Sequence, residues 1–170
     1  MKNLFLITGE EVYERNECLE KIKLSFGELV KGINYIVLDK DTISSLESEI
    51  DTYPFGFSQK LIVVKLDKKS TKDEEEDKKQ DFLTDSLIET LENLDDSVGV
   101  VFIGDFTLKS KIYKLVEKNG KCFNFEKKKE NELINWCREI FDENEIKISN
   151  QDISYLINLA GTEKLVFIFF

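Results

Sequence analysis

Continuous apolar runs alternate with helix-spaced apolar residues along much of the chain. The runs span residues 4–8, 33–38, 61–66, 98–103 and 122–125. Unbroken runs such as Leu61-Ile62-Val63-Val64 predict strands that are buried on both faces. Between the runs, apolar positions recur every three or four residues and predict four helices, at Val12, Leu19, Ile22 and Phe26, at Ile43, Leu46 and Ile50, at Leu83, Leu87, Leu91 and Leu94, and at Leu108, Ile112, Leu115 and Val116. This alternation predicts an α/β fold, a five-stranded parallel three-layer sheet.

After the lysines at 127–129 the pattern becomes wholly helical. Two helices are predicted, around residues 133–141 and 153–160, and Ser149-Asn150-Gln151-Asp152 has the form of a capping box that opens the second one. We therefore expect an α/β domain over 1–128 and a small all-helical domain over 129–170. Two helices make a poor core by themselves, so the second domain is expected to be incomplete, and an apolar run follows it at 165–170.

Composition narrows the chemistry. The chain has 170 residues, 41% of them apolar, with no histidine and a formal net charge of −10. Without histidine, Ser-His-Asp and Cys-His catalysis and the commonest zinc sites are excluded, so we expect no catalytic residues, no metal and no cofactor. Three widely spaced cysteines and the lack of a long apolar segment favour a cytoplasmic protein without a membrane span.

The turn after the first strand, Thr8-Gly9-Glu10-Glu11, lies where a parallel sheet can bind a nucleotide. A phosphate-binding loop needs several glycines followed by Lys-Ser or Lys-Thr. Here one glycine precedes two carboxylates, which would repel a triphosphate. The turn is therefore predicted not to work as a P-loop.

A second possibility is a phosphoacceptor site like that of response-regulator receivers. Asp67 at the end of a strand would accept the phosphate, Glu10 and Glu11 would hold Mg²⁺, and a lysine from 127–129 would pair with the phosphate. Against this, Asp67 opens a run of five lysines and six acids over 67–79, which is typical of a solvated loop.

Lysines are concentrated in one segment. Residues 109–129 contain eight lysines and two glutamates, a local charge of +6 in an acidic chain. A lysine-rich surface helix is the simpler interpretation. The alternative is proximity to a DNA backbone within a larger assembly, through Lys109, Lys111, Lys114 and Lys118.

The segment Tyr53-Pro54-Phe55-Gly56-Phe57 holds the chain's single proline and three aromatic residues. Proline restricts the backbone and glycine permits a sharp reversal, so this connection is predicted to be stiff. A rigid loop that presents a phenylalanine loses little entropy when the ring enters a partner's pocket. The ring could instead fold back as a lid over the sheet edge; we expect Phe55 exposed and Phe57 inward.

Four segments in this order resemble the delta subunit family of bacterial DNA polymerase III, a component of the clamp loader. They are Met1 to Glu11, Pro54 to Val64, Val101-Phe102-Ile103-Gly104-Asp105 and Glu132-Leu133-Ile134-Asn135-Trp136. The resemblance implies an AAA+-type, P-loop NTPase-like fold without a functional P-loop. It also implies a chain that ends inside the second domain, before the helical collar that joins the loader subunits.

The resemblance further implies a function in DNA replication. Such a subunit neither binds nor hydrolyses ATP; it binds the ring-shaped sliding clamp (the beta subunit) and helps to open it for loading onto primed DNA, as part of a DNA-directed DNA polymerase, a nucleotidyltransferase holoenzyme. The family's clamp-binding pair, an aliphatic residue and a phenylalanine, falls on Pro54 and Phe55, with Phe57 nearby. Proline at the aliphatic position leaves Phe55 as the main expected anchor.

Overall fold

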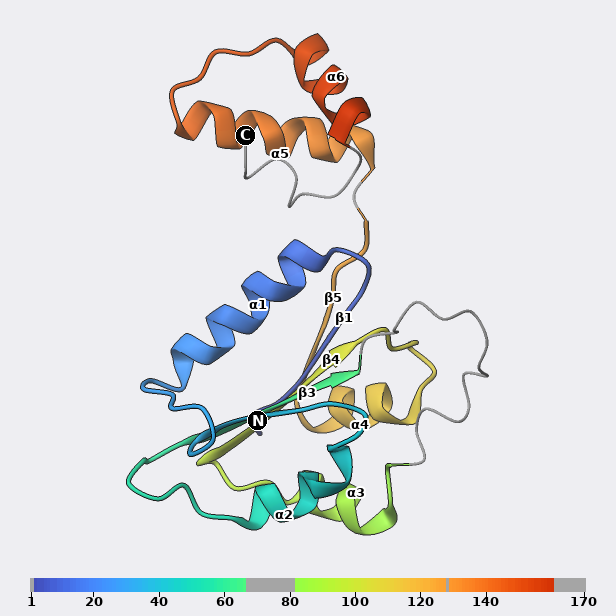
Figure 1. The fold of residues 1–170 in the computed structure, drawn as a ribbon. Helices are drawn as coiled ribbons and strands as arrows, with labels where there is room; N and C mark the ends of the chain where they lie inside the picture. Colours follow the sequence, from blue (N-terminus) through green and yellow to red (C-terminus); the bar gives the residue numbers. More distant parts are fainter. Residues whose placement is uncertain (1, 67–81, 128, 161–170) are drawn as a thin grey trace. The chain divides into compact units, whose positions relative to one another are not determined.

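The computed structural model describes residues 2–66, 82–127 and 129–160. Strands and helices alternate through the first part of the chain, and helices follow (Figure 1). In chain order the elements are β1 (Leu4–Thr8), α1 (Val12–Ser25), β2 (Tyr35–Leu38), the 3₁₀ turn η1 (Ile43–Ser45), α2 (Leu46–Asp51), β3 (Lys60–Leu66), α3 (Asp85–Glu92), β4 (Val98–Gly104), α4 (Lys111–Asn119), β5 (Lys121–Asn124), α5 (Glu130–Glu143) and α6 (Asn150–Ala160).

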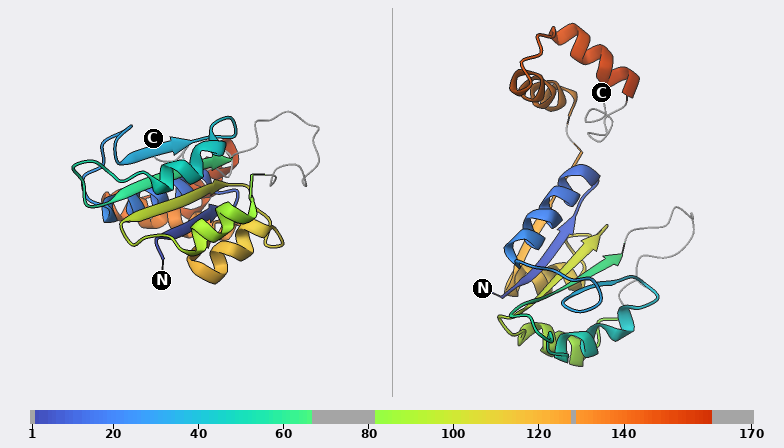
Figure 2. Two further views of the ribbon diagram at one scale, coloured as in Figure 1. Left: turned by 90° about the horizontal axis from the view of Figure 1, so that it is seen from below. Right: turned by 60° about the vertical axis from the view of Figure 1, so that its left-hand side comes forward.

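The strands form one five-stranded sheet in the order β2-β3-β4-β1-β5, and every pairing is parallel. The central pair runs from Lys60 opposite Val98 to Leu66 opposite Gly104. Helix α1 lies on one face of the sheet, and α2, α3 and α4 lie on the other (Figures 1 and 2). The predicted three-layer α/β fold is confirmed.

Both faces of the sheet are buried, as the continuous apolar strands predicted. Every residue of β4 is buried, as are the first five of β3. Ile62, Val64, Val100 and Phe102 pack with α2, α3 and α4 in the main core. The alternate residues of the same strands point to the opposite face, where the Phe26 ring after α1 lies against Gly99.

Some predicted positions differ from the structure. Val12 and Leu108 were expected on buried helix faces, yet they are 46% and 60% exposed. Leu108 precedes the fourth helix, because Ser110 caps α4 by accepting a hydrogen bond from the Tyr113 amide. Strand β2 begins two residues later than predicted, because Asn34 is buried and binds backbone groups of neighbouring loops.

The chain divides into two compact units. The first comprises residues 1–8 and 17–124, and the second comprises 9–16 and 125–170. The expected division after 128 thus falls earlier, and the second unit also includes the turn after β1. The reason is local: the Glu11 amide donates to the Phe125 carbonyl at 3.0 Å, and the Tyr13 and Trp136 rings lie 6.2 Å apart.

Within the second unit, α5 and α6 pack around a small core of Leu133, Cys137, Ile153 and Ile157. The Ser149 hydroxyl caps α6 by accepting from the Asp152 amide and donating to the Asp152 carboxylate, in agreement with the predicted capping motif. The apolar run at 165–170 lies outside the described residues.

Candidate functional site

Residues 53–59, here called the Phe55 loop, connect α2 to β3. The Phe57 amide donates to the Pro54 carbonyl at 3.2 Å and closes a four-residue turn. Gly56 has φ +81°, the value that a type II turn requires at its third residue. A Cβ at Gly56 would meet no atom within 4 Å, so the left-handed backbone, and not crowding, explains the glycine. Phe55 therefore sits at the tip of a defined turn.

The Phe55 side chain is 91% exposed. The interpretation of this ring as a lid over the sheet is therefore wrong, and the expectation of an exposed ring is confirmed. Phe57 is half-buried, and Tyr53 is 78% exposed. Pro54, expected beside Phe55 as a contact residue, is instead buried. Proline thus holds the loop against the protein, while Tyr53 and Phe55 project from it.

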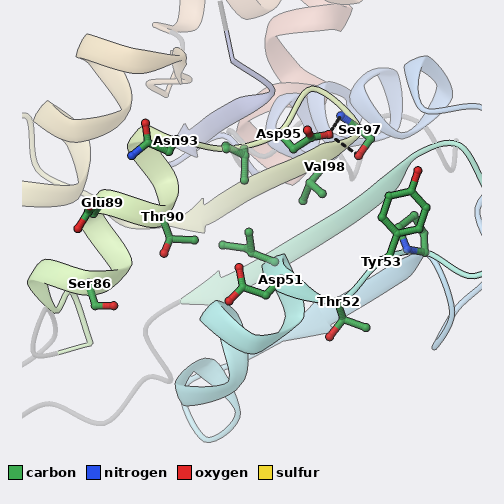
Figure 3. A pocket seen from close by; sticks show the side chains of 13 residues that line it. Asp51, Thr52, Tyr53, Ser86, Glu89, Thr90, Asn93, Asp95, Ser97 and Val98 are labelled. Atoms are coloured by element: carbon green, nitrogen blue, oxygen red, sulfur yellow. Dashed lines mark hydrogen bonds between the residues drawn. The ribbon is translucent and has the colours of Figure 1, made fainter.

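A pocket of about 540 Å³ lies beside the base of the Phe55 loop. The end of α2 and Tyr53 form one wall, and α3 with the connection to β4 forms the other (Figure 3). Asp51, Glu89 and Asp95 contribute carboxylates, and none of the described lining residues is basic. Two hydrogen bonds from Ser97, from its amide and its hydroxyl, already engage Asp95 and lower the pKa of that carboxyl.

Two buried polar residues hold the ends of the Phe55 loop. Lys60, the first residue of β3, is only 1% exposed, and its ammonium binds the end of α2. Asn34, also 1% exposed, donates to the Gln59 carbonyl at 3.1 Å. The sequence gave no signal for either role, because a lysine next to an apolar run is ordinarily a surface residue.

The turn after β1 is packed against the segment that follows β5. A Cβ at Gly9 (φ +107°) would lie 2.1 Å from the Phe125 carbonyl oxygen, so this glycine permits a close backbone approach. The Glu11 amide, a group that a phosphate would need, already donates to that oxygen. The Arg15 guanidinium donates to the Gly9 carbonyl at 3.2 Å.

The strand order argues against the phosphoacceptor site. A receiver sheet has the order 2-1-3-4-5, which places the ends of β1 and β3 side by side. Here β4 separates them, so the two ends lie about 10 Å apart at 4.8 Å per strand. Glu10 does approach Lys127, at 3.9 Å between exposed groups, but Glu11 is buried. Asp67 lies outside the described residues.

The four lysines expected near DNA lie on and just before α4. Lys109, Lys111, Lys114 and Lys118 are all exposed. The Lys118 ammonium pairs with the Glu92 carboxylate at 3.1 Å, and this pairing lowers the pKa of Glu92. The structure gives these lysines a common location without testing whether they approach DNA.

The cysteines and carboxylates offer little chemistry. Burial, followed by the nearby Glu117 charge, raises the pKa of Cys122 to about 11, and burial also raises the pKa of Cys18. Both thiols are therefore poor nucleophiles at neutral pH. In the part of the chain that the structure describes, no three histidine, cysteine, aspartate or glutamate side chains are grouped to hold a metal ion. No helix in that same part is long and apolar enough to cross a bilayer.

These features define a parallel three-layer α/β domain that is joined to helices and presents an exposed aromatic turn. Residues 5–126 match the family described as DNA polymerase III, delta subunit. The chain belongs to this family. A search of curated proteins found no match.

Solved structures resemble the fold. The Bacillus subtilis DNA clamp loader delta protein aligns with a TM-score of 0.67 at 14% identity, covering 98% of this chain and 51% of that one. This chain thus spans about half the length of that protein. A DNA polymerase III gamma subunit-related protein from Thermotoga maritima aligns with a TM-score of 0.49 at 14% identity, covering 82% of this chain and 47% of that one.

Proposed function

We propose that this chain is the clamp-binding part of a clamp-loader delta subunit, and that Phe55 is its main anchor on the sliding clamp. The observation that carries the proposal is the almost fully exposed Phe55 ring at the tip of a closed turn, in a chain of the delta subunit family. Exposing a large aromatic ring to water is unfavourable, and burial in a partner's pocket removes that cost.

The described residues of the loop divide the work between them. Buried Pro54 and half-buried Phe57 hold the turn against the domain, so that Phe55 is presented without a large loss of entropy on binding. Tyr53, also exposed, lies close enough in sequence to extend the contact. Phe57, expected from the resemblance to replace an aliphatic contact, supports the turn from inside and retains some exposed surface for the clamp.

Ring opening follows from differential binding. A subunit that binds the open clamp more tightly than the closed clamp shifts the equilibrium between the two by the difference in binding free energy. Equal affinity for both forms would leave the ring closed. The delta subunit therefore acts on the clamp without a chemical step of its own, and other loader subunits and primed DNA complete the assembly.

The proposed subunit has no nucleotide site of its own. The packing of Gly9 against Phe125, and the use of the Glu11 amide in that contact, support this part of the proposal. ATP with Mg²⁺ is accordingly expected to leave the melting temperature of the chain unchanged, since a ligand that binds the native state stabilises it. A rise in melting temperature that depends on ATP concentration would contradict it.

The proposal is tested by titrating the full chain with the cognate sliding clamp in two forms. One form is the closed ring, and the other is a clamp variant whose subunit interface has been broken by substitution. We expect binding to both and higher affinity for the broken form. Failure to bind either form would refute clamp binding, and equal affinities would refute ring opening by this part of the chain.

A further inference from the structure

We infer that Lys60 is a positioning residue that holds the Phe55 loop in the geometry in which it presents its aromatic tip. The inference deepens the proposed function and rests on it for the clamp-binding part. Lys60 itself contacts no partner, because its side chain is 1% exposed. It acts through the loop that ends where β3 begins.

The contacts of the Lys60 ammonium account for all three of its N–H groups. It donates to the Glu49 carbonyl at 2.6 Å, to a Glu49 carboxylate oxygen at 3.0 Å and to the Thr52 carbonyl at 3.3 Å. The last carbonyls of a helix have no partner within the helix. Lys60 supplies partners for two carbonyls at the end of α2, and its positive charge is favourable at that end.

These contacts tie together the two ends of the loop. Thr52 directly precedes the loop, and Lys60 directly follows it. The Lys60 amide also donates to the Ser97 carbonyl at 2.8 Å, which fixes the start of β3 beside β4. Asn34 holds Gln59 from the other side. The seven residues between Thr52 and Lys60 therefore begin and end on atoms that buried side chains hold in place.

A buried charge is retained at such a position only where its partners compensate for lost hydration. A methionine at residue 60 would fill a similar volume but leave the Glu49 and Thr52 carbonyls without this donor. The end of α2 would then fray, and the Pro54–Phe57 turn would occupy its closed geometry for a smaller fraction of the time. Apparent affinity falls in proportion to that fraction.

The first experiment needs no partner. Amide hydrogen exchange is measured in the full chain and in Lys60→Met, with Lys118→Met as the matched control that loses an exposed lysine paired with Glu92. We expect Lys60→Met to speed exchange at the Thr52 and Phe57 amides by about tenfold, while β4 stays protected. The control is expected to exchange like the parent chain. Unchanged exchange at Phe57 in a folded Lys60→Met variant would overturn the inference.

The second experiment asks whether Lys60 acts through Phe55. Clamp affinity is measured for Lys60→Met, Phe55→Ala and the double variant. We expect Lys60→Met to weaken binding about five- to tenfold, corresponding to a closed turn populated one fifth to one tenth of the time. In the Phe55→Ala background the same substitution should change affinity by less than about twofold. An equal loss in both backgrounds would overturn the inference.

The two proposals can fail separately. If Phe55→Ala leaves clamp affinity unchanged but Lys60→Met still loosens the Phe57 amide, clamp binding through Phe55 is refuted and loop anchoring by Lys60 is supported. If Lys60→Met does not fold, Glu49→Ala removes one of the three acceptors from the same ammonium. It is expected to speed Phe57 exchange about two- to threefold, and no change there would count against the inference.

Discussion

Replacing Phe55 by alanine separates the function of the loop from the stability of the fold. The ring is 91% exposed, so its removal takes almost no buried surface from the folded chain. The free energy of unfolding should therefore change by less than about 0.5 kcal/mol. The clamp complex should lose far more, because a ring that enters a pocket buries roughly 100 Å² more apolar surface than alanine does.

At about 25 cal/mol per Å², that area corresponds to about 2.5 kcal/mol. A loss of about 2 kcal/mol is usual for an aromatic anchor at the centre of an interface, and it weakens binding roughly 30-fold. Isothermal titration of the clamp with the full chain measures this loss, and urea unfolding of each variant checks stability. Tyr155→Ala is the matched control, since this aromatic side chain is 66% exposed in the second unit.

The reasoning makes a sharp distinction between the two variants. Phe55→Ala should keep its unfolding midpoint and lose clamp affinity, whereas Tyr155→Ala should keep both. A folded Phe55→Ala chain that binds the clamp as tightly as its parent would refute the assignment of Phe55 as the anchor. Equal losses in the two variants would show that exposed aromatic residues contribute without regard to position.

Three further predictions concern the rest of the chain. Gly99→Ala should lower the free energy of unfolding by roughly 1–3 kcal/mol in urea titrations, because a Cβ there would lie 2.2 Å from the Phe26 ring. Cys122, with a pKa of about 11, should react slowly with iodoacetamide at pH 8 and faster as the pH approaches that value. Its raised pKa means that the folded chain holds the thiol proton more tightly, so stability should fall as the pH rises from about 8.5 through 11. In an assembled loader on primed DNA, removing charge from exposed lysines of the α4 region should reduce the salt dependence of binding by about 0.9 per lost phosphate contact, and an unchanged slope would exclude DNA contacts by Lys109, Lys111 and Lys114.

The sequence predicted the strands well because burial on both faces leaves a direct mark, an unbroken apolar run. Leu4–Thr8 matches β1, and Leu61 to Leu66 misses only the first residue of β3. The order of the strands leaves no such mark, since an apolar run shows that a strand is buried and not which strand lies beside it. The place of β1 between β4 and β5 therefore had to come from the structure.

The candidate site was predictable only in part, for a related reason. Proline and glycine bracket Phe55, and local backbone preferences are enough to predict a turn with an exposed tip. Whether Pro54 is buried depends on how the end of α2 packs, which is a tertiary property. The same holds for Lys60, whose partners lie 8 and 11 residues earlier in the chain.

The most direct test of the central claim replaces Phe55 by the photoreactive residue p-benzoylphenylalanine in the full chain. After irradiation with the cognate sliding clamp, mass spectrometry of the crosslinked peptides identifies which clamp residues lie next to the loop tip. We predict crosslinks confined to residues that line one apolar clamp pocket, and none from the same photoreactive residue placed at Tyr155. Absence of any crosslink from position 55 under conditions where the two proteins form a complex would contradict the claim.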